Sequence, residues 1–248
     1  QKTKKQIVNA MIYPTIVFVF AIAVIVFIML YVVPQFTEIY ASMGVNIPSF
    51  TRMVMNVSNY LKNNAITLLL IIIGVLTVLL VLIKNFKGVR RTYQYILMHI
   101  PVIKDVIIYS EVVTFSKTFA SLLANNVFIT DSMDILSKLS TNEIYKDLIY
   151  KTIENLGKGE KLSIAFKNHW AFPIPAYEML VTGEKTGQLP EMMAKVAAYY
   201  QEEQENIVAR LKTFIEPILI VFLTVIVGII ILSIIIPMFS MYESMTQL

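Results

Sequence analysis

The pattern of polar and apolar positions divides the chain into three long uncharged apolar stretches and the remaining segments, which carry all the charge. Residues 6–37, 63–83 and 217–242 contain no Asp, Glu, Lys or Arg. Each stretch is long enough for a helix that crosses the hydrocarbon core of a bilayer, which takes about 20 apolar residues. Lipid cannot satisfy exposed backbone groups, so such segments are helical. The pattern predicts transmembrane helices over residues 14–34, 63–83 and 215–237.

The first and third apolar stretches are two copies of one element. At a constant offset of 203 residues the following pairs match: Ile12 and Ile215, Pro14 and Pro217, Val24 and Val227, Pro34 and Pro237, Phe36 and Phe239. A fixed offset of this kind indicates an internal repeat. We therefore expect residues 1–13 to be the end of a first cytoplasmic repeat, the rest of which would precede Gln1.

The basic residues predict the orientation of the chain in the membrane. They gather before the first span and after the second, and none follows the third: Lys2, Lys4, Lys5, Lys84, Lys87, Arg90, Arg91 and Lys104. Because basic flanks stay inside, the N-terminus and residues 84–214 are predicted to be cytoplasmic. The loop 35–62 and the tail 238–248 would lie outside. The basic run at 84–104 fits contact with anionic lipid headgroups better than nucleic acid.

Residues 84–214 have apolar positions at helical spacing, which predicts one cytoplasmic six-helix bundle and an all-α fold. Its first helix has an apolar face at Val112, Phe115, Phe119 and Leu122. We expect Thr130 to cap the second helix, whose inward residues would be Met133, Ile135 and Leu136. Thr141 or Asn142 would cap the third, which faces inward with Ile144, Leu148, Ile149, Ile153 and Leu156 and stops at Gly157.

The second half of this segment predicts a short helix, a corner and one long helix. The short helix covers 162–168, and the connector 172–175 contains two prolines. A fifth helix over 176–182 would end in a turn over 183–187. The sixth helix is predicted to start near Pro190, a favourable position for proline. It continues into the third span without a loop signal.

Enzymatic chemistry finds little support in the residue types present. The chain has no cysteine, which excludes thiolate nucleophiles and disulfides. His99 and His169 have no partners at ligand spacing, and no Walker-type glycine loop occurs. We therefore predict a protein that is not an enzyme and has no metal or cofactor. Apart from Glu216 at the edge of the third span, the three spans contain no acid, Lys, Arg or His, which disfavours an ion-coupled transporter.

Two groups of residues are candidates for partner contact or for shaping the spans. The first group consists of the glycines and charges of the corner, two acids of the sixth helix, and an acid at the edge of the third span: Gly183, Glu184, Lys185, Gly187, Glu202, Glu203 and Glu216. A structural role is the alternative for some of them. The two glycines would then serve only to allow positive φ and close packing, and Glu216 would only face lipid headgroups. The second group would shape the spans: Pro14, Pro34, Pro217, Gly228 and Pro237.

Several motifs in order resemble one known family. These are Phe115–Leu123 (FSKTFASLL), Gly159–Ser163 (GEKLS), Gly183–Leu189 (GEKTGQL), Ile215-Glu216-Pro217 and Pro237-Met238-Phe239. Together they resemble the general secretion protein F / pilus assembly protein C family, over essentially the whole chain. Two positions depart from the family pattern. Lys185 stands where the family usually has an acid or a small polar residue, and Asn126 stands where it often has glycine. Family members can bind a divalent ion in a first bundle, but this property assigns no metal ligand among the residues of this chain.

The resemblance implies an inner-membrane platform of a prokaryotic type IV filament or type II secretion machine. Its implied partners are an assembly or retraction ATPase, pilin or pseudopilin subunits, other inner-membrane assembly proteins, membrane lipids and a second copy of the chain. Nucleic acid is not among them. Two alternatives stay open: a small permease or channel subunit with a helical regulatory domain, and a purely structural membrane anchor.

Overall fold

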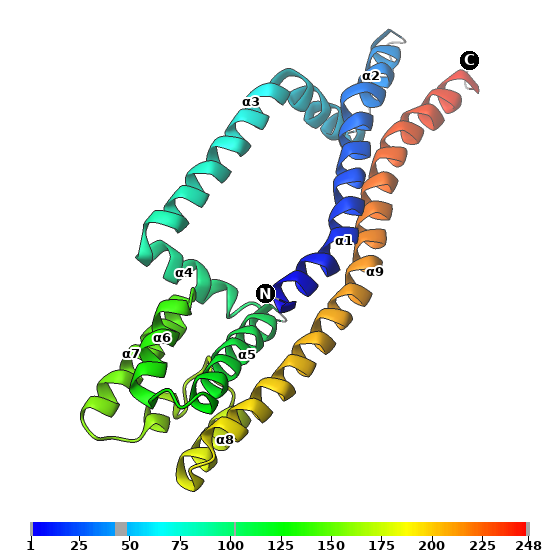
Figure 1. The fold of residues 1–248 in the computed structure, drawn as a ribbon. Coiled ribbons are helices and arrows are strands. Elements are labelled where there is room, and N and C mark those ends of the chain that lie inside the picture. The colour runs from blue at the N-terminus through cyan, green and yellow to red at the C-terminus, as the bar shows by residue number, and fades with distance from the viewer. Residues whose placement is uncertain (1, 43–48, 102, 247–248) are drawn as a thin grey trace. The chain divides into compact units, whose positions relative to one another are not determined.

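The structure, a computed structural model, describes residues 2–42, 49–101 and 103–246, which form helices joined by short turns (Figure 1). The predicted all-α class is confirmed, since the described residues contain no strand. The chain divides into two compact units. One comprises Gln1–Ile7 and Leu79–Leu211, here called the bundle unit. The other comprises Val8–Val78 and Lys212–Leu248, here called the span unit.

The span unit is built mainly from the long apolar helices. These are α1 (Lys2–Phe27), a π-helical turn (Ile28–Val32), α2 (Val33–Ser42), α3 (Ser49–Asn85) and the later part of α9 (Leu189–Thr246). By length and composition, four of the described helices could cross a membrane. Three of them, Ile12–Tyr40, Ser49–Asn85 and Leu189–Ile236, overlap the three predicted spans, and the fourth, Ile103–Ala124, belongs to the bundle unit. Much of the predicted loop 35–62 is helical, because α3 already begins at Ser49 with buried Val54 and Met55.

A small apolar cluster in the span unit surrounds the π-helical turn. It contains Val33, Tyr40, Met55 and Ile230, and the Tyr40 hydroxyl donates to the carbonyl of Ile234 at 2.6 Å. In the wider π turn Val33 donates its N–H five residues back, to Ile28. Pro34 comes next and has no N–H to give to Met29. The hydroxyl of Ser58 donates to that Met29 carbonyl instead.

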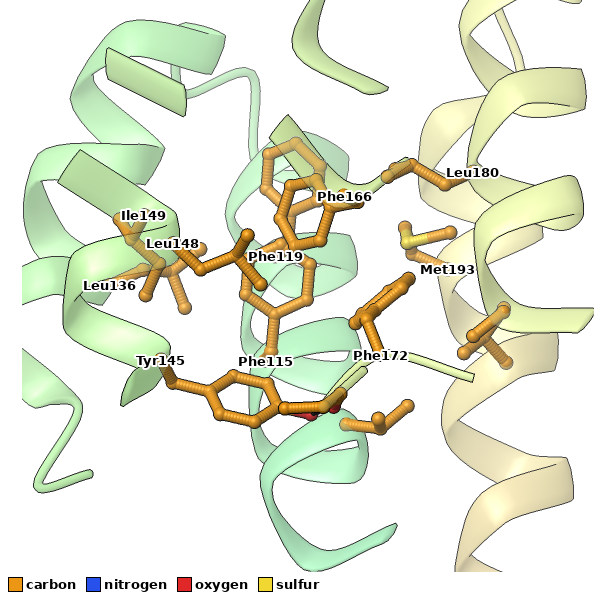
Figure 2. Packing of buried hydrophobic residues seen from close by; sticks show 14 of the residues in the cluster. Phe115, Phe119, Leu136, Tyr145, Leu148, Ile149, Phe166, Phe172, Leu180 and Met193 are labelled. Carbon is orange, nitrogen blue, oxygen red and sulfur yellow. Dashed lines mark hydrogen bonds between the residues drawn. The ribbon is translucent and has the colours of Figure 1, made fainter. Parts of the chain in front are cut away.

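The bundle unit contains α4 (Lys87–Leu97), α5 (Ile103–Ala124), α6 (Ile129–Leu139), α7 (Glu143–Gly157), a 3-10 helix (Leu162–Phe166), α8 (Ile174–Thr186) and the first part of α9. Its core is aromatic, as Figure 2 shows: Phe115 lies 5.2 Å from Phe166, ring centre to ring centre, and Phe166 lies 4.6 Å from Phe172. The Tyr145 hydroxyl donates to the Ala171 carbonyl at 2.5 Å.

Most of the predicted bundle helices are present, with corrections at their ends. Asn142 caps α7, accepting from the N–H groups of Ile144 and Tyr145, and the predicted inward residues Ile144, Leu148 and Ile149 are buried. Thr130 is not a cap, because α6 already begins at Ile129 after a tight reversal at Asn126, whose φ is +59°. The predicted inward side chain of Ile135 is exposed.

The predicted continuity of the last helix is confirmed. Helix α9 begins at Leu189 and runs without a break to Thr246, through Pro217 and Pro237. The described part of the chain therefore has no loop between the bundle end of α9 and the third apolar stretch.

Candidate functional site

The corner between α8 and α9 is tighter than the sequence predicts. Helix α8 continues to Thr186, so Gly183 lies inside the helix and only Gly187 and Gln188 make the turn. Gly187 has φ +72°, where glycine is favoured, and both Gly187 and Gln188 donate their N–H to the Gly183 carbonyl. The predicted helix 176–182 is thus present but longer, from Ile174 to Thr186, and the prediction of a turn over 183–187 is wrong.

Gly183 is needed because α8 and α9 approach each other closely at this corner. An added Cβ at Gly183 would lie 3.0 Å from the Cβ of Met192 and 3.1 Å from the Cα of Leu189. The second distance is to backbone, which cannot move aside like the end of a side chain. The structural interpretation of this glycine as a close-packing residue is the one the geometry supports.

Glu184 points inward and joins the two Gly-Glu-Lys segments of the chain. Its carboxylate accepts the N–H of Leu162 at 2.6 Å, and the hydroxyl and N–H of Ser163 at 2.6 and 3.4 Å. These N–H groups open the 3-10 helix, for which Lys161 offers no side-chain acceptor. Glu184, a candidate for partner contact, thus has its carboxylate bonded within the bundle, whereas Lys185 is exposed. Sequence reasoning missed Ser163 as its partner.

The two candidate acids of α9, Glu202 and Glu203, lie beside a packed seam with α5. Tyr200 meets Tyr109 at 5.0 Å between ring centres, and buried Gln204 donates to the Val106 carbonyl at 3.4 Å. Glu202 is exposed and Glu203 is half-buried. The burial of the Tyr200 ring raises the pKa of its hydroxyl to about 12, so it stays neutral. Glu202 is thus the more accessible of the two acids.

Glu111 is a titratable residue that the sequence analysis did not single out. It lies on the same helix as the core residues Val112 and Phe115, in a small space lined also by Tyr145 and Ile149. Burial raises the pKa of its carboxyl from 4.5 to about 7. The pattern could have flagged it, because an acid directly before an apolar helical face is close to the core.

Glu216 lies at a groove in the span unit whose two walls come from the two copies of the repeat. The groove has a volume of about 710 Å³ and is lined by three equivalent pairs from α1 and α9: Tyr13 and Glu216, Pro14 and Pro217, Val17 and Ile220. Each pair has the offset of 203 residues. Proline displaces the preceding turn of a helix and leaves a backbone group unpaired, which fits a groove at this level.

The chemistry of the groove is simple. Glu216 is the one charged residue among those lining it, and the other walls are mainly apolar. Such a site suits an apolar segment that carries a positive charge or a hydrogen-bond donor. Among the residues that the structure describes, no group of three His, Cys, Asp or Glu side chains could hold a metal ion.

The other candidates for shaping the spans lie in or next to the long helices. Pro14 is inside α1 and buried, Pro217 and Pro237 are inside α9, and Pro34 follows the π-helical turn. A Cβ added to Gly228 would meet no described atom within 4 Å. The structure therefore gives Pro34 a local role and shows no close packing at Gly228.

Comparison with known proteins gives consistent similarities. Residues 115–237 match the family described as Type II secretion system (T2SS), protein F. The chain is 31% identical to the type IV pilus assembly protein PilC of Pseudomonas aeruginosa, over 97% of this chain and 64% of that protein. It is 32% identical to PilC of Thermus thermophilus, over 96% of this chain and 59% of that protein.

A secretion protein is similar to a lesser degree. The type II secretion system protein F of Pseudomonas aeruginosa is 24% identical over 98% of this chain and 60% of that protein. The chain thus spans about three fifths of the length of the relatives it matches.

Proposed function

Because the chain belongs to the family of type II secretion protein F and type IV pilus assembly protein C, we propose that it forms the inner-membrane platform of a filament assembly machine. In this role it couples a cytoplasmic ATPase to the insertion of pilin or pseudopilin subunits. The observation that carries the proposal is the unbroken helix α9. It bears Glu202 among the bundle residues and Glu216 at the groove.

The proposed mechanism assigns separate tasks along α9. The ATPase contacts the water-exposed side of the bundle, where Lys185 and Glu202 are accessible. Gly183, Glu184 and Gly187 fix the corner at which α9 begins. Movement of the bundle passes along the helix to the membrane level.

The groove is the proposed entry point for the filament subunit. An apolar subunit helix would leave the bilayer, lie against the paired prolines and present a donor or cation to Glu216. Positioning by other inner-membrane assembly proteins and by a second copy of the chain completes the platform. In the proposed topology the N-terminus and residues 84–214 are cytoplasmic and the C-terminus is outside, as the basic flanks favour.

The proposal is tested by softening α9 and comparing the result with a control variant that loses the same two charges. Glu202→Gly/Glu203→Gly should weaken the helix by about 1 kcal/mol per position relative to alanine. The matched control is Glu202→Ala/Glu203→Ala, which loses the same charges and keeps the helix. We expect the glycine variant to insert and to co-purify with the ATPase, yet to assemble far fewer filaments than the alanine variant.

Other outcomes separate the contributions. Equal, near-normal filament counts for both variants would contradict transmission through α9. Equal loss in both would assign the effect to the two carboxylates and not to helix continuity.

The second function to be tested is a permease or channel subunit, because the groove could pass a small solute. The lack of charged residues inside the spans, where Glu216 at the edge of the third is the exception, speaks against it, since coupled transporters use ionisable groups near the midplane. Substrate-dependent flux in liposomes containing the protein alone would support it over the platform.

A further inference from the structure

Helix α4 has one face fixed to the bundle by polar contacts. Arg90 pairs with Glu143 at 2.5 Å and Arg91 with Asp147 at 2.9 Å. Gln94 accepts the Glu143 N–H through Oε1 at 2.8 Å and donates to the Thr141 carbonyl through Nε2 at 3.2 Å. These bonds hold α4 against the start of α7 in one rotational setting. The opposite face of α4 is therefore fixed as well.

That outward face is apolar and uncovered. Val89, Tyr93 and Ile96 are 40%, 44% and 55% exposed, and their spacing of four and three residues places them on one side of the helix. Thr92 shares this side, but its hydroxyl is already bonded to the Gly88 carbonyl at 3.1 Å. The face therefore offers few unpaired polar groups to water or to a partner.

Trp170, the one tryptophan of the chain, lies against the adjoining side of α4, at Tyr95. Its ring lies edge-on to Tyr95 at 5.5 Å and 4.6 Å from the ring of His99, and it remains 44% exposed. Tyrosine and tryptophan combine an apolar ring with a polar tip, which suits the layer between lipid tails and water. We call Val89, Tyr93 and Ile96, together with the exposed pair Tyr95 and Trp170 on the adjoining side of the helix, the α4 face.

The charges and the position in the chain identify what covers the α4 face. Helix α3, long and apolar enough to cross a membrane, ends at Asn85, and α4 begins at Lys87. Lys84, Lys87 and Lys104 are exposed, and no acid occurs between residues 63 and 104. A short basic helix with an apolar outer side, directly after a span, fits the surface of an anionic bilayer.

We propose that the α4 face lies in the headgroup layer of an anionic membrane leaflet and holds the bundle against the membrane surface. The outer apolar residues enter the boundary of the acyl chains, and the lysines meet lipid phosphates. The ion pairs of Arg90 and Arg91 join α4 to α7, so that the membrane contact of α4 also holds the rest of the bundle. The inference goes beyond filament assembly, since it concerns lipid binding and would hold whichever partner the platform serves.

The experiment uses the fluorescence of Trp170 in the whole chain. The protein is placed in nanodiscs of phosphatidylcholine with or without phosphatidylglycerol, with bromine on the upper part of the acyl chains. We expect bromolipid to quench Trp170, and to quench it more when phosphatidylglycerol is present. Val89→Asp/Ile96→Asp should lose most of the quenching. The matched control Ile135→Asp/Leu139→Asp changes two exposed apolar residues of α6 and should quench like the parent protein.

A second measurement, with a dye attached at single positions, tests the proposal without the double aspartate variants. An environment-sensitive dye on Ile96→Cys should shift to the blue in anionic nanodiscs, whereas the same dye on exposed Glu160→Cys should not. Lys84→Gln/Lys87→Gln should abolish the preference for phosphatidylglycerol. Equal iodide quenching of Trp170 in nanodiscs and in detergent, with no dye shift at position 96, would overturn the proposal. A blue shift in lipid-free amphipol that disappears on dilution would also overturn it, because a second copy would then cover the face.

Discussion

Helices α3 and α5 are both long and apolar enough to cross a membrane, yet they differ in where their apolar residues lie. Within the most apolar window of α5, 39% of the residues are buried, among them Val112, Phe115 and Phe119 in the bundle core. None is buried in the corresponding window of α3, whose leucines and isoleucines are exposed on all sides. Apolar content alone therefore does not separate a span from a core helix. The distribution of apolar residues around the helix does separate them, because a core helix needs only one apolar stripe, whereas a span is surrounded by lipid.

The largest effect should come from emptying the core of the bundle. Phe119→Ala should reduce the free energy of unfolding by roughly 3–5 kcal/mol, because Phe119 is fully buried. Its control in the same unit is Phe128→Ala, where the ring is 76% exposed and the change should stay within about 0.5 kcal/mol. Urea unfolding of the whole chain in detergent, followed by Trp170 fluorescence, measures both. Similar losses for the two variants would refute the assigned core.

A charge should have the opposite preference for the two regions. Ile73→Arg, at the middle of the apolar stretch of α3, should cost about 2.5–3.5 kcal/mol of membrane insertion. Ile135→Arg, on the exposed side of α6 in the bundle, should leave insertion unchanged. The inserted fraction of each variant after synthesis into membrane vesicles gives the comparison. Normal insertion of Ile73→Arg would mean that α3 is not surrounded by lipid.

Removing the carboxylate of Glu184 should affect folding before it affects any partner. Glu184→Ala leaves the Leu162 and Ser163 donors without their acceptor, which should cost about 1–3 kcal/mol of bundle stability. Lys185→Ala, at the exposed neighbouring position, should change stability by less than about 0.5 kcal/mol. The same urea titration distinguishes them. A Glu184→Ala bundle as stable as the parent would return this residue to the surface role predicted from the sequence.

The smallest effect concerns the buried acid of α5 and depends on pH. Because the pKa of Glu111 rises from 4.5 to about 7 on folding, the folded bundle binds its proton more tightly than the unfolded chain does. Stability should therefore fall as pH rises from about 4.5 to 7, and the full penalty is present above that. Glu111→Gln should be more stable than the parent at pH 8 by on the order of 1 kcal/mol, with no difference below pH 4.5. Exposed Glu178→Gln is the control, and a pH-independent gain for Glu111→Gln would contradict the assignment.

Much of the fold was predictable, for different physical reasons in the two regions. The spans follow from uncharged length, and the face of α5 at Val112, Phe115 and Phe119 follows from helical period. The continuity of α9 follows from the lack of any turn residue before the third apolar stretch. These features depend on residues close together in the sequence, which is why the sequence alone suffices.

The missed features depend on contacts between distant segments. Glu184 reaches Leu162 and Ser163 only because α8 folds back onto the 3-10 helix, which no local pattern indicates. The repeat predicts that Pro14 and Pro217 are equivalent, but not that they line one groove. Helix α4 was missed because its basic residues were interpreted only as a topology signal and a contact for lipid headgroups, although Val89, Tyr93 and Ile96 have helical spacing.

Cysteine labelling in intact cells tests the central claim, a membrane platform whose bundle is on the cytoplasmic side. The chain has no native cysteine, so Ser49→Cys at the start of α3 and Glu160→Cys in the bundle give clean single sites. A membrane-impermeant maleimide should label position 49 from outside, and position 160 only after the membrane is opened. Labelling of position 160 in intact cells, with position 49 protected, would contradict the account.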